Sequence, residues 1–346
     1  MKQKILQTIL FPLLFLFSIT VLANNTKIPP RPTKKINAFI QHMVKKYNFN
    51  RKELTALMQH AKYNPKVIRS ITYPFEKKPW NFYRRFFLTK ERIEGGAKYW
   101  EQHLKTLNAV KKEYGVNPAV IIAIIAIESK FGKHAGTYNE LSALSTLAFY
   151  YPKRSKFFKK ELIHFLLLTR KEKLPTLEIR GSYAGALGIP QFMPSSYRHY
   201  AVDYTKNQSI DLMKNHDDAI ASIANYLKRS GWKLNQPVAV PAKISGKVPQ
   251  QLISKKAIPN YTIKQLEQHK VFPAETESAN RKAALIAMQN TDSSEYWIVF
   301  RNFRAIMKYN PRTTYSMAVY ELSRAIKQAY DRQNKTSPTT SHQRTV

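Results

Sequence analysis

The sequence predicts a mainly α fold with a small β element, an α+β protein. Most of the chain places apolar residues at helical spacing, as in FIQHMVKKY and YWEQHLKTLNAV. Between residues 234 and 300 this rhythm breaks, because prolines recur at 237, 241, 249 and 259 and short runs such as PVAVPA and YWIVF indicate strands. The 346 residues, 43% of them hydrophobic, are enough to form a buried core.

The elements follow one another in a simple order. A polar, Pro-rich linker is expected at residues 24–35, and one domain is expected at 36–330. Its helices are expected within 36–107 and at 118–131, 155–173, 216–232, 301–310 and 317–330, around a β insertion at about 234–300. Asp217 or Asp218 can cap the helix that starts at residue 216. The polar tail at 331–346 is predicted to be disordered.

The N-terminus has the pattern of a secretory signal. Lys2 and Lys4 precede an apolar run at residues 5–23, which ends in small residues suited to a signal peptidase. Residues 1–23 are therefore predicted to be a signal peptide that leads to the periplasm. An uncleaved inner-membrane anchor is the alternative, because this run is just long enough to span a bilayer. The chain has no Cys, which excludes disulfides, thiolate metal sites and a lipid-modified cysteine.

The charge is strongly positive. The chain has 57 Lys and Arg and 22 Asp and Glu, a formal net charge of +35. Such a surface attracts an anionic polymer, although lysine is also an ordinary solubilising residue. Export argues against nucleic acid as the partner and favours an anionic polymer of the cell envelope.

Glu128 stands at the end of an unusually apolar segment, VIIAIIAIESKFG. Asn117 and Pro118 mark the start of its helix, and Gly132 marks the stop. An acid in the last turn meets the negative end of the helix dipole and has apolar helical neighbours, so its pKa should be raised. A carboxyl that keeps its proton near neutrality can act as a general acid. The alternative is a surface glutamate paired with Lys130 or Lys133.

Three further groups of residues suit a carbohydrate or its attached peptide. The segment GSYAGALGIPQFMPSSY contains three closely spaced glycines with Ser182 and Gln191, which could hold sugar hydroxyl or acetamido groups; a tight packing point is the alternative. Lys153 and Arg154 could bind a carboxylate, or could simply begin a basic helix. The last group comprises Tyr226, Tyr309, Asn310 and Tyr315, which also suit the edge of a core.

The segment DYTKNQSID resembles a degraded calcium loop. Oxygen-bearing side chains alternate along it: Asp203, Thr205, Asn207, Ser209 and Asp211. Gln208 stands where the turn glycine belongs, and Lys214 stands where the bidentate glutamate belongs. No cofactor is predicted to be required, and these two residues argue against calcium.

Four motifs in order resemble the membrane-bound lytic murein transglycosylase B family. They are AIIAIESKFGKHAGTYNELSALSTLAFYYPKR, GSYAGALGIPQFMPSSYRHYAVDY, DDAIASIANYLKRSGW and KYNPRTTYSMAVYEL, and the similarity spans residues 36–328. The resemblance implies a lysozyme-like catalytic core similar to goose-type lysozyme. It also implies cleavage of the β-1,4 bond between N-acetylmuramic acid and N-acetylglucosamine in peptidoglycan.

The resemblance also implies roles for individual residues. Glu128 is the single catalytic acid, and Ser182 and Gln191 belong to the glycine loop. Lys153 and Arg154 contact the stem peptide, with Lys153 in place of the more usual Arg, which loses a bidentate contact. The glycan-binding residues are Tyr226, Tyr309, Asn310 and Tyr315.

One carboxyl suffices for a reaction in which the substrate supplies the nucleophile. Ordinary glycosidases need two carboxylates, and no second acid is an obvious partner for Glu128; Glu140 more plausibly serves a helix start. The single acid fits the reaction that the resemblance implies, which acts on glycan strands and stem peptides and forms 1,6-anhydromuramoyl ends. We also expect a monomer. The alternatives are a hydrolytic muramidase, a non-catalytic peptidoglycan-binding protein and a basic nucleic-acid binder.

Overall fold

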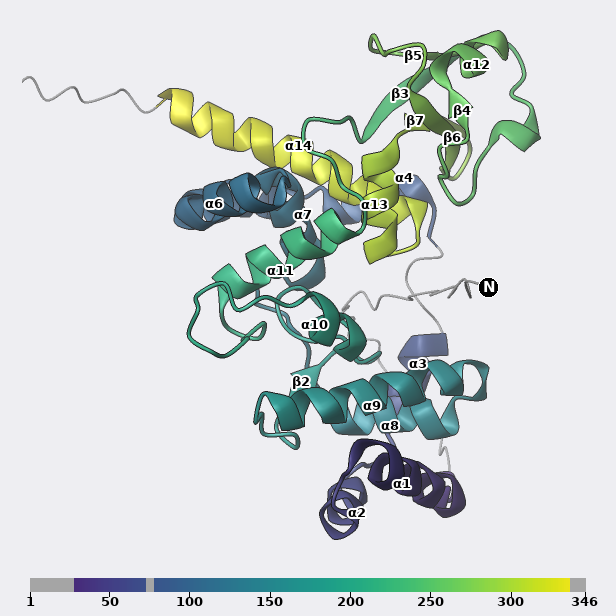
Figure 1. Ribbon diagram of the computed structural model, residues 1–346. Coiled ribbons are helices and arrows are strands. Elements are labelled where there is room, and N and C mark those ends of the chain that lie inside the picture. The colour runs from purple at the N-terminus through teal and green to yellow at the C-terminus, as the bar shows by residue number, and fades with distance from the viewer. Residues whose placement is uncertain (1–27, 73–77, 337–346) are drawn as a thin grey trace, which may run out of the picture. The chain divides into compact units, whose positions relative to one another are not determined.

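The computed structural model describes residues 28–72 and 78–336 (Figure 1). The predicted signal segment, residues 1–23, lies outside the described residues. The chain forms two compact units, which are described one at a time. The sheet unit comprises Lys78–Ile127 and the described residues from Ala224 onward. The loop unit comprises residues 28–72 and Glu128–Ile223.

The sheet unit combines helices with a five-stranded antiparallel sheet. Its strands are β3 (Ala239–Ile244), β4 (Tyr261–Thr262), β5 (Val271–Pro273), β6 (Lys282–Gln289) and β7 (Ser294–Val299), in the order β4-β6-β7-β3-β5. Its helical elements are α4 (Trp80–Phe87), α5 (Lys90–Gln102), α6 (Leu104–Tyr114), most of α7 (Pro118–Ser129), the end of α11 (His216–Arg229), η3 (Gln250–Leu252), α12 (Ile263–Gln268), α13 (Arg301–Tyr309) and α14 (Thr313–Thr336).

Both faces of the sheet are covered. Leu285 of β6 and Ile298 of β7 are register partners, and on one face they join a core cluster that includes Leu266 of α12. Side chains alternate along a strand, so the neighbouring residue Trp297 faces the opposite side. There its ring packs edge-on against Tyr320 of α14, with centroids 6.4 Å apart. The sheet therefore forms a middle layer within this unit, which explains why its strands contain so few polar residues.

The loop unit is mainly helical. Its elements are α1 (Thr33–Tyr47), α2 (Arg51–Gln59), α3 (Pro65–Thr72), β1 (Tyr138–Asn139), α8 (Glu140–Tyr150), η2 (Pro152–Arg154), α9 (Ser155–Lys171), β2 (Arg180–Gly181), α10 (Pro194–Tyr200) and the first part of α11. Every residue of α8 from Glu140 to Phe149 is buried, so this helix forms the centre of the unit. β1 and β2 pair in antiparallel fashion and bring residue 138 beside the start of the glycine-rich segment.

Several boundaries differ from the sequence prediction for identifiable reasons. Helix α1 starts at Thr33, inside the expected linker, and the Arg31 guanidinium donates to the Met58 carbonyl at 2.6 Å, which fastens this end to α2. Helix α14 continues to Thr336, beyond the expected end at residue 330. The predicted cap of α11 is wrong, because Asn215 Oδ1 accepts from the backbone N–H groups of Asp217 and Asp218.

No helix within the described residues is both long enough and apolar enough to cross a membrane. The expected fold class, mainly α with a small antiparallel sheet, is confirmed.

Candidate active site

Helix α7 carries Glu128 in its last turn, as the sequence predicts. Every residue from Pro118 to Ser129 is buried, which explains why the helix is apolar on all sides. Glu128 itself is only 2% exposed. The alternative of a surface glutamate is therefore wrong. The raised pKa expected for Glu128 stays a prediction.

The turn after Glu128 has an unusual backbone. Lys130, Phe131 and Gly132 have φ values of 46°, 62° and 83°, all in the left-handed region. A bulky side chain such as phenylalanine rarely adopts this conformation, so the turn must be held by its surroundings. Ser129 is one such constraint, because its Oγ donates to the Ile189 carbonyl at 2.8 Å and accepts from Gly132 N–H at 3.0 Å. Strain of this kind is often found at functional sites.

The glycine loop, residues 181–192, packs directly against this turn. Gln191 Nε2 donates to the Ala135 carbonyl at 2.9 Å and to the Gly188 carbonyl at 2.8 Å. Gly188 has φ +70°, and a Cβ there would lie 2.2 Å from the Leu212 carbonyl oxygen, so only glycine fits. The loop and the Glu128 turn thus hold each other in place. Sequence spacing alone could not show this contact, which joins residues 56 positions apart.

Ser182 and Gln191 are both fully buried, and each contributes to the architecture of the loop. Ser182 Oγ accepts from Ala186 N–H at 3.0 Å and from Ala184 N–H at 3.3 Å. These bonds fit the interpretation of the loop as a tight packing point. Gln191 Oε1 is also buried and has no hydrogen-bond partner among the described residues. Contact of either residue with sugar stays a prediction.

Lys153 and Arg154 lie in η2, between α8 and α9, but in different surroundings. Lys153 is exposed. Arg154 is half-buried, with its guanidinium carbon 4.3 Å from the centroid of the Phe157 ring and 5.2 Å from that of Phe158. Burial lowers the pKa of Arg154, and the nearby Tyr151 and Glu161 partly oppose this effect. Of the two, Lys153 is the side chain that extends into solvent.

The sheet unit brings the four predicted glycan-binding residues into one cluster. The rings of Tyr226 and Tyr309 are 4.9 Å apart, and those of Tyr309 and Tyr315 are 6.5 Å apart and nearly parallel. Tyr226 donates its hydroxyl to the Lys308 carbonyl. Asn310 is 1% exposed, and both polar atoms of its amide lack a hydrogen-bond partner within the described chain. A buried amide without partners is costly, so Asn310 is the member of this cluster best suited to receive a polar ligand.

Sequence reasoning missed a second buried carboxyl, Glu140. It is the first residue of α8, which agrees with the expected helix start, but it is also fully buried. A Cβ on Gly181 would lie 2.1 Å from Glu140 Oε2, so the carboxyl packs directly beneath the glycine loop. Neither oxygen has a hydrogen-bond partner among the described residues. An acid within an apolar run, the signal used at Glu128, would have found it.

Burial raises the pKa of Glu140 well above its ordinary value, and the negative charge of Glu161 raises it further. Glu161 of α9 is 4% exposed, and burial raises its pKa too. Unlike Glu140, it has partners, because its two oxygens accept from the backbone N–H and the hydroxyl of Ser195 at 2.9 and 2.8 Å. Glu140 has no surface exposed to solvent, so it is a poor candidate for a second catalytic carboxylate.

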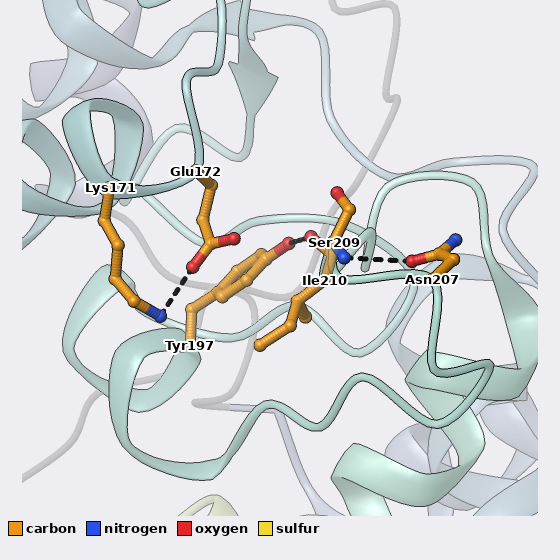
Figure 2. Close-up of polar contacts among 6 residues, drawn as sticks. All are labelled: Lys171, Glu172, Tyr197, Asn207, Ser209 and Ile210. Carbon is orange, nitrogen blue, oxygen red and sulfur yellow. Dashed lines mark hydrogen bonds and ion pairs between the residues drawn. The ribbon is translucent and has the colours of Figure 1, made fainter.

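The residues of the degraded calcium loop are engaged with each other instead of converging on a common point. The two Asp203 oxygens accept from the backbone N–H groups of Asn207 and Gln208. Asn207 Oδ1 accepts from Ser209 N–H at 2.9 Å (Figure 2). Figure 2 also shows the Tyr197 hydroxyl donating to the Ile210 carbonyl, which fastens the end of the loop.

Asp218 is a buried group that organises the backbone of this loop. It is fully buried, and its oxygens accept from the backbone N–H groups of Tyr204, Thr205 and Asp211. No group of three or more His, Cys, Asp or Glu side chains arranged to hold a metal ion is found in the described residues. That calcium is not required stays a prediction, which the hydrogen bonds already formed by Asp203 and Asn207 support.

Calcium is therefore expected to leave stability unchanged. The melting temperature should be the same within roughly 1 °C in excess calcium and in EDTA, since an ion that binds only the folded state would raise it. Thermal scans of the wild type and of Asp203→Asn would test this. A rise of several degrees with calcium in the wild type alone would show that the loop binds the ion.

Comparison with known proteins agrees with this architecture. The sequence matches the family described as transglycosylase SLT domain over residues 32–324. It is 36% identical over 303 residues to the membrane-bound lytic murein transglycosylase B of Escherichia coli (strain K12), covering 83% of this chain and 81% of that protein.

Two solved structures from Pseudomonas aeruginosa are also similar. Soluble lytic transglycosylase SltB1 has a TM-score of 0.81 and 35% identity, covering 86% of this chain and 99% of that one. SltB3 in complex with NAG-anhNAM-pentapeptide has a TM-score of 0.75 and 26% identity, covering 85% of this chain and 79% of that one.

A mainly helical fold with a buried glutamate at the end of an apolar helix, fixed by a glycine loop, defines a lysozyme-like enzyme of the lytic transglycosylase class. The chain belongs to the transglycosylase SLT domain family. The resemblance stated from the sequence is thereby confirmed.

Proposed function

We propose that this protein cleaves the β-1,4 bond between N-acetylmuramic acid and N-acetylglucosamine in peptidoglycan without consuming water, and leaves 1,6-anhydromuramoyl ends. The observation that carries this proposal is Glu128, a buried acid on a constrained turn in a member of this family. The fragment named in the SltB3 complex supports peptidoglycan as the substrate.

The reaction needs one protein carboxyl, used twice. Glu128 first donates its proton to the glycosidic oxygen, and the bond from that oxygen to C1 breaks. The acetamido carbonyl of the substrate stabilises the positive charge that develops at C1. Glu128, now a carboxylate, removes the proton of the muramoyl 6-hydroxyl, whose oxygen forms the new bond to C1. The proton lost in the first step is regained in the last, so the enzyme ends unchanged.

The remaining predicted residues would bind the substrate. The amide of Asn310 has a donor and an acceptor without hydrogen-bond partners among the described residues, which suits an acetamido group. Lys153 would meet a carboxylate of the stem peptide. We further infer that the protein acts in the periplasm as a monomer without a cofactor, with membrane association through residues 1–23 if these are not removed.

The mass of the products tests the reaction. Wild-type protein incubated with purified sacculi should release muropeptides that carry anhydro ends, which mass spectrometry detects as lighter by one water than hydrolytic products. Products with reducing ends would instead identify a muramidase. Binding to sacculi without any release of fragments would identify a non-catalytic wall-binding protein.

A further inference from the structure

The N-terminal helices of the loop unit carry an exceptional charge. Residues 28–72 contain ten Lys and Arg but only one acid, Glu53, so their formal net charge is 10 − 1 = +9. Residues 78–127, by comparison, contain nine basic and four acidic side chains, for a net charge of +5. Concentrated positive charge of this kind attracts anionic surfaces and decides where a protein associates, without determining its fold.

The charges of α1 and α2 surround two shallow grooves. Helix α1 turns Ile36, Phe39 and Met43 inward, where the ring of Phe39 meets that of Phe149 in α8 at 5.7 Å. On the outside, two adjoining grooves share Ala38 and Gln41 as lining residues, and no acid lines either groove. The charged or titratable side chains that line them are Lys34, His42, Lys45, Lys46 and Arg51, which we call the basic face.

The cations of the basic face are available for a partner. Lys34, Lys45, Lys46 and Arg51 are exposed, and none forms an ion pair with an acid among the described residues. Arg84 and Lys327 of the sheet unit are different, because they pair with Glu321 and Asp331 at 2.6 Å. Because the buried side of α1 holds its backbone in place, binding a partner would order only the side chains of the basic face.

We propose that the basic face docks on the anionic phospholipid headgroups of a membrane. The predicted apolar segment ends at Ala23, only five residues before Ile28, and five extended residues reach about 17 Å. Ile28 is 76% exposed and adds an apolar side chain at the same end. Each Lys or Arg held close to an anionic membrane surface adds to its attraction, so the basic face supplies binding of its own whether or not the apolar segment is retained. None of these residues belongs to the candidate active site, so the proposal does not depend on the proposed reaction.

Vesicle binding tests the proposal. All described elements lie within residues 33–336, so a chain that starts at Asn24 keeps each of them and removes the apolar segment as a competing source of binding. This protein should sediment with vesicles of phosphatidylglycerol and phosphatidylethanolamine but not with phosphatidylcholine alone, and salt should release it. The variant Lys34→Gln, Lys45→Gln, Lys46→Gln, Arg51→Gln should bind on the order of 100-fold more weakly, since each lost cation costs several-fold.

The control removes the same charge elsewhere. Lys243→Gln, Lys255→Gln, Lys256→Gln, Lys264→Gln changes four exposed lysines in or beside the sheet and should bind vesicles nearly as well as the wild type. Equal losses in both variants would overturn the proposal, because binding would then follow net charge alone. It would equally be overturned if the basic-face variant lost binding to sacculi and kept its binding to vesicles. Thermal scans of both variants would confirm that they remain folded.

Discussion

Replacing Glu128 by glutamine is expected to lower the rate of glycan cleavage by at least about 10³-fold while the protein stays folded. Glutamine has nearly the same shape as a protonated glutamate, so it fits the buried position at the end of α7. It can neither give a proton to the glycosidic oxygen nor take one from the 6-hydroxyl, and both steps of the proposed route fail together. The release of soluble muropeptides from sacculi measures the effect.

The matched control for this variant is Glu178→Gln, which changes an exposed acid of the loop unit and should leave the rate unchanged. Binding of the Glu128 variant to sacculi should also persist, since the residues proposed to hold the substrate remain. Retention of a substantial fraction of the wild-type rate in Glu128→Gln would contradict the single-acid mechanism and would direct attention to another carboxyl.

Replacing Glu140 by glutamine is expected to stabilise the protein at neutral and alkaline pH. Burial, followed by the charge of Glu161, raises the pKa of Glu140 well above its ordinary value of 4.5. The contribution of Glu140 to stability is therefore fully present below about pH 4.5 and is lost as pH rises through the pKa of the folded state. Glutamine cannot ionise, so the variant does not lose stability through this group as the pH rises.

The melting temperature measured across pH checks this prediction. The melting temperature of the wild type should fall relative to that of Glu140→Gln as pH rises. The gap should be at least about 3 °C at pH 8, which corresponds to roughly 2 kcal/mol in a protein of this size. Glu161 also has a raised pKa and remains in the variant, so some decline persists in both. Equal or lower stability of the variant at every pH would show that Glu140 is ionised and paired. Glu178→Gln again serves as the exposed control.

Local patterns in the sequence predicted much of the fold. The bounds of α9, residues 155–171 against the expected 155–173, and of α13, residues 301–309 against 301–310, show how well periodicity places buried helices. The less accurate ends have causes outside the local sequence. Helix α1 begins early because Arg31 reaches two backbone carbonyls near the end of α2, some thirty residues away.

The candidate site was predictable to a different degree at each residue. Glu128 carries a local signal, because its helix start, its apolar neighbours and its stop are all adjacent in the chain. Gln191 carries no such local signal, because its hydrogen bond to the Ala135 carbonyl depends on the path of the glycine loop. Asp217 or Asp218 was expected to cap a helix, but Asp218 instead accepts hydrogen bonds from backbone N–H groups of the loop at residues 204–211.

The sequence by itself determined the family, the fold class and the single acid at the end of an apolar helix, because periodicity, helix signals and motifs are properties of neighbouring residues. Only the tertiary structure decided which buried polar groups have hydrogen-bond partners. Glu161 accepts hydrogen bonds from Ser195. Glu140, which lies beneath Gly181, and the amide of Asn310 have no such partner among the described residues. The physical reason is that solvation and hydrogen bonding depend on residues distant in the chain, and these two effects determine where a proton is held.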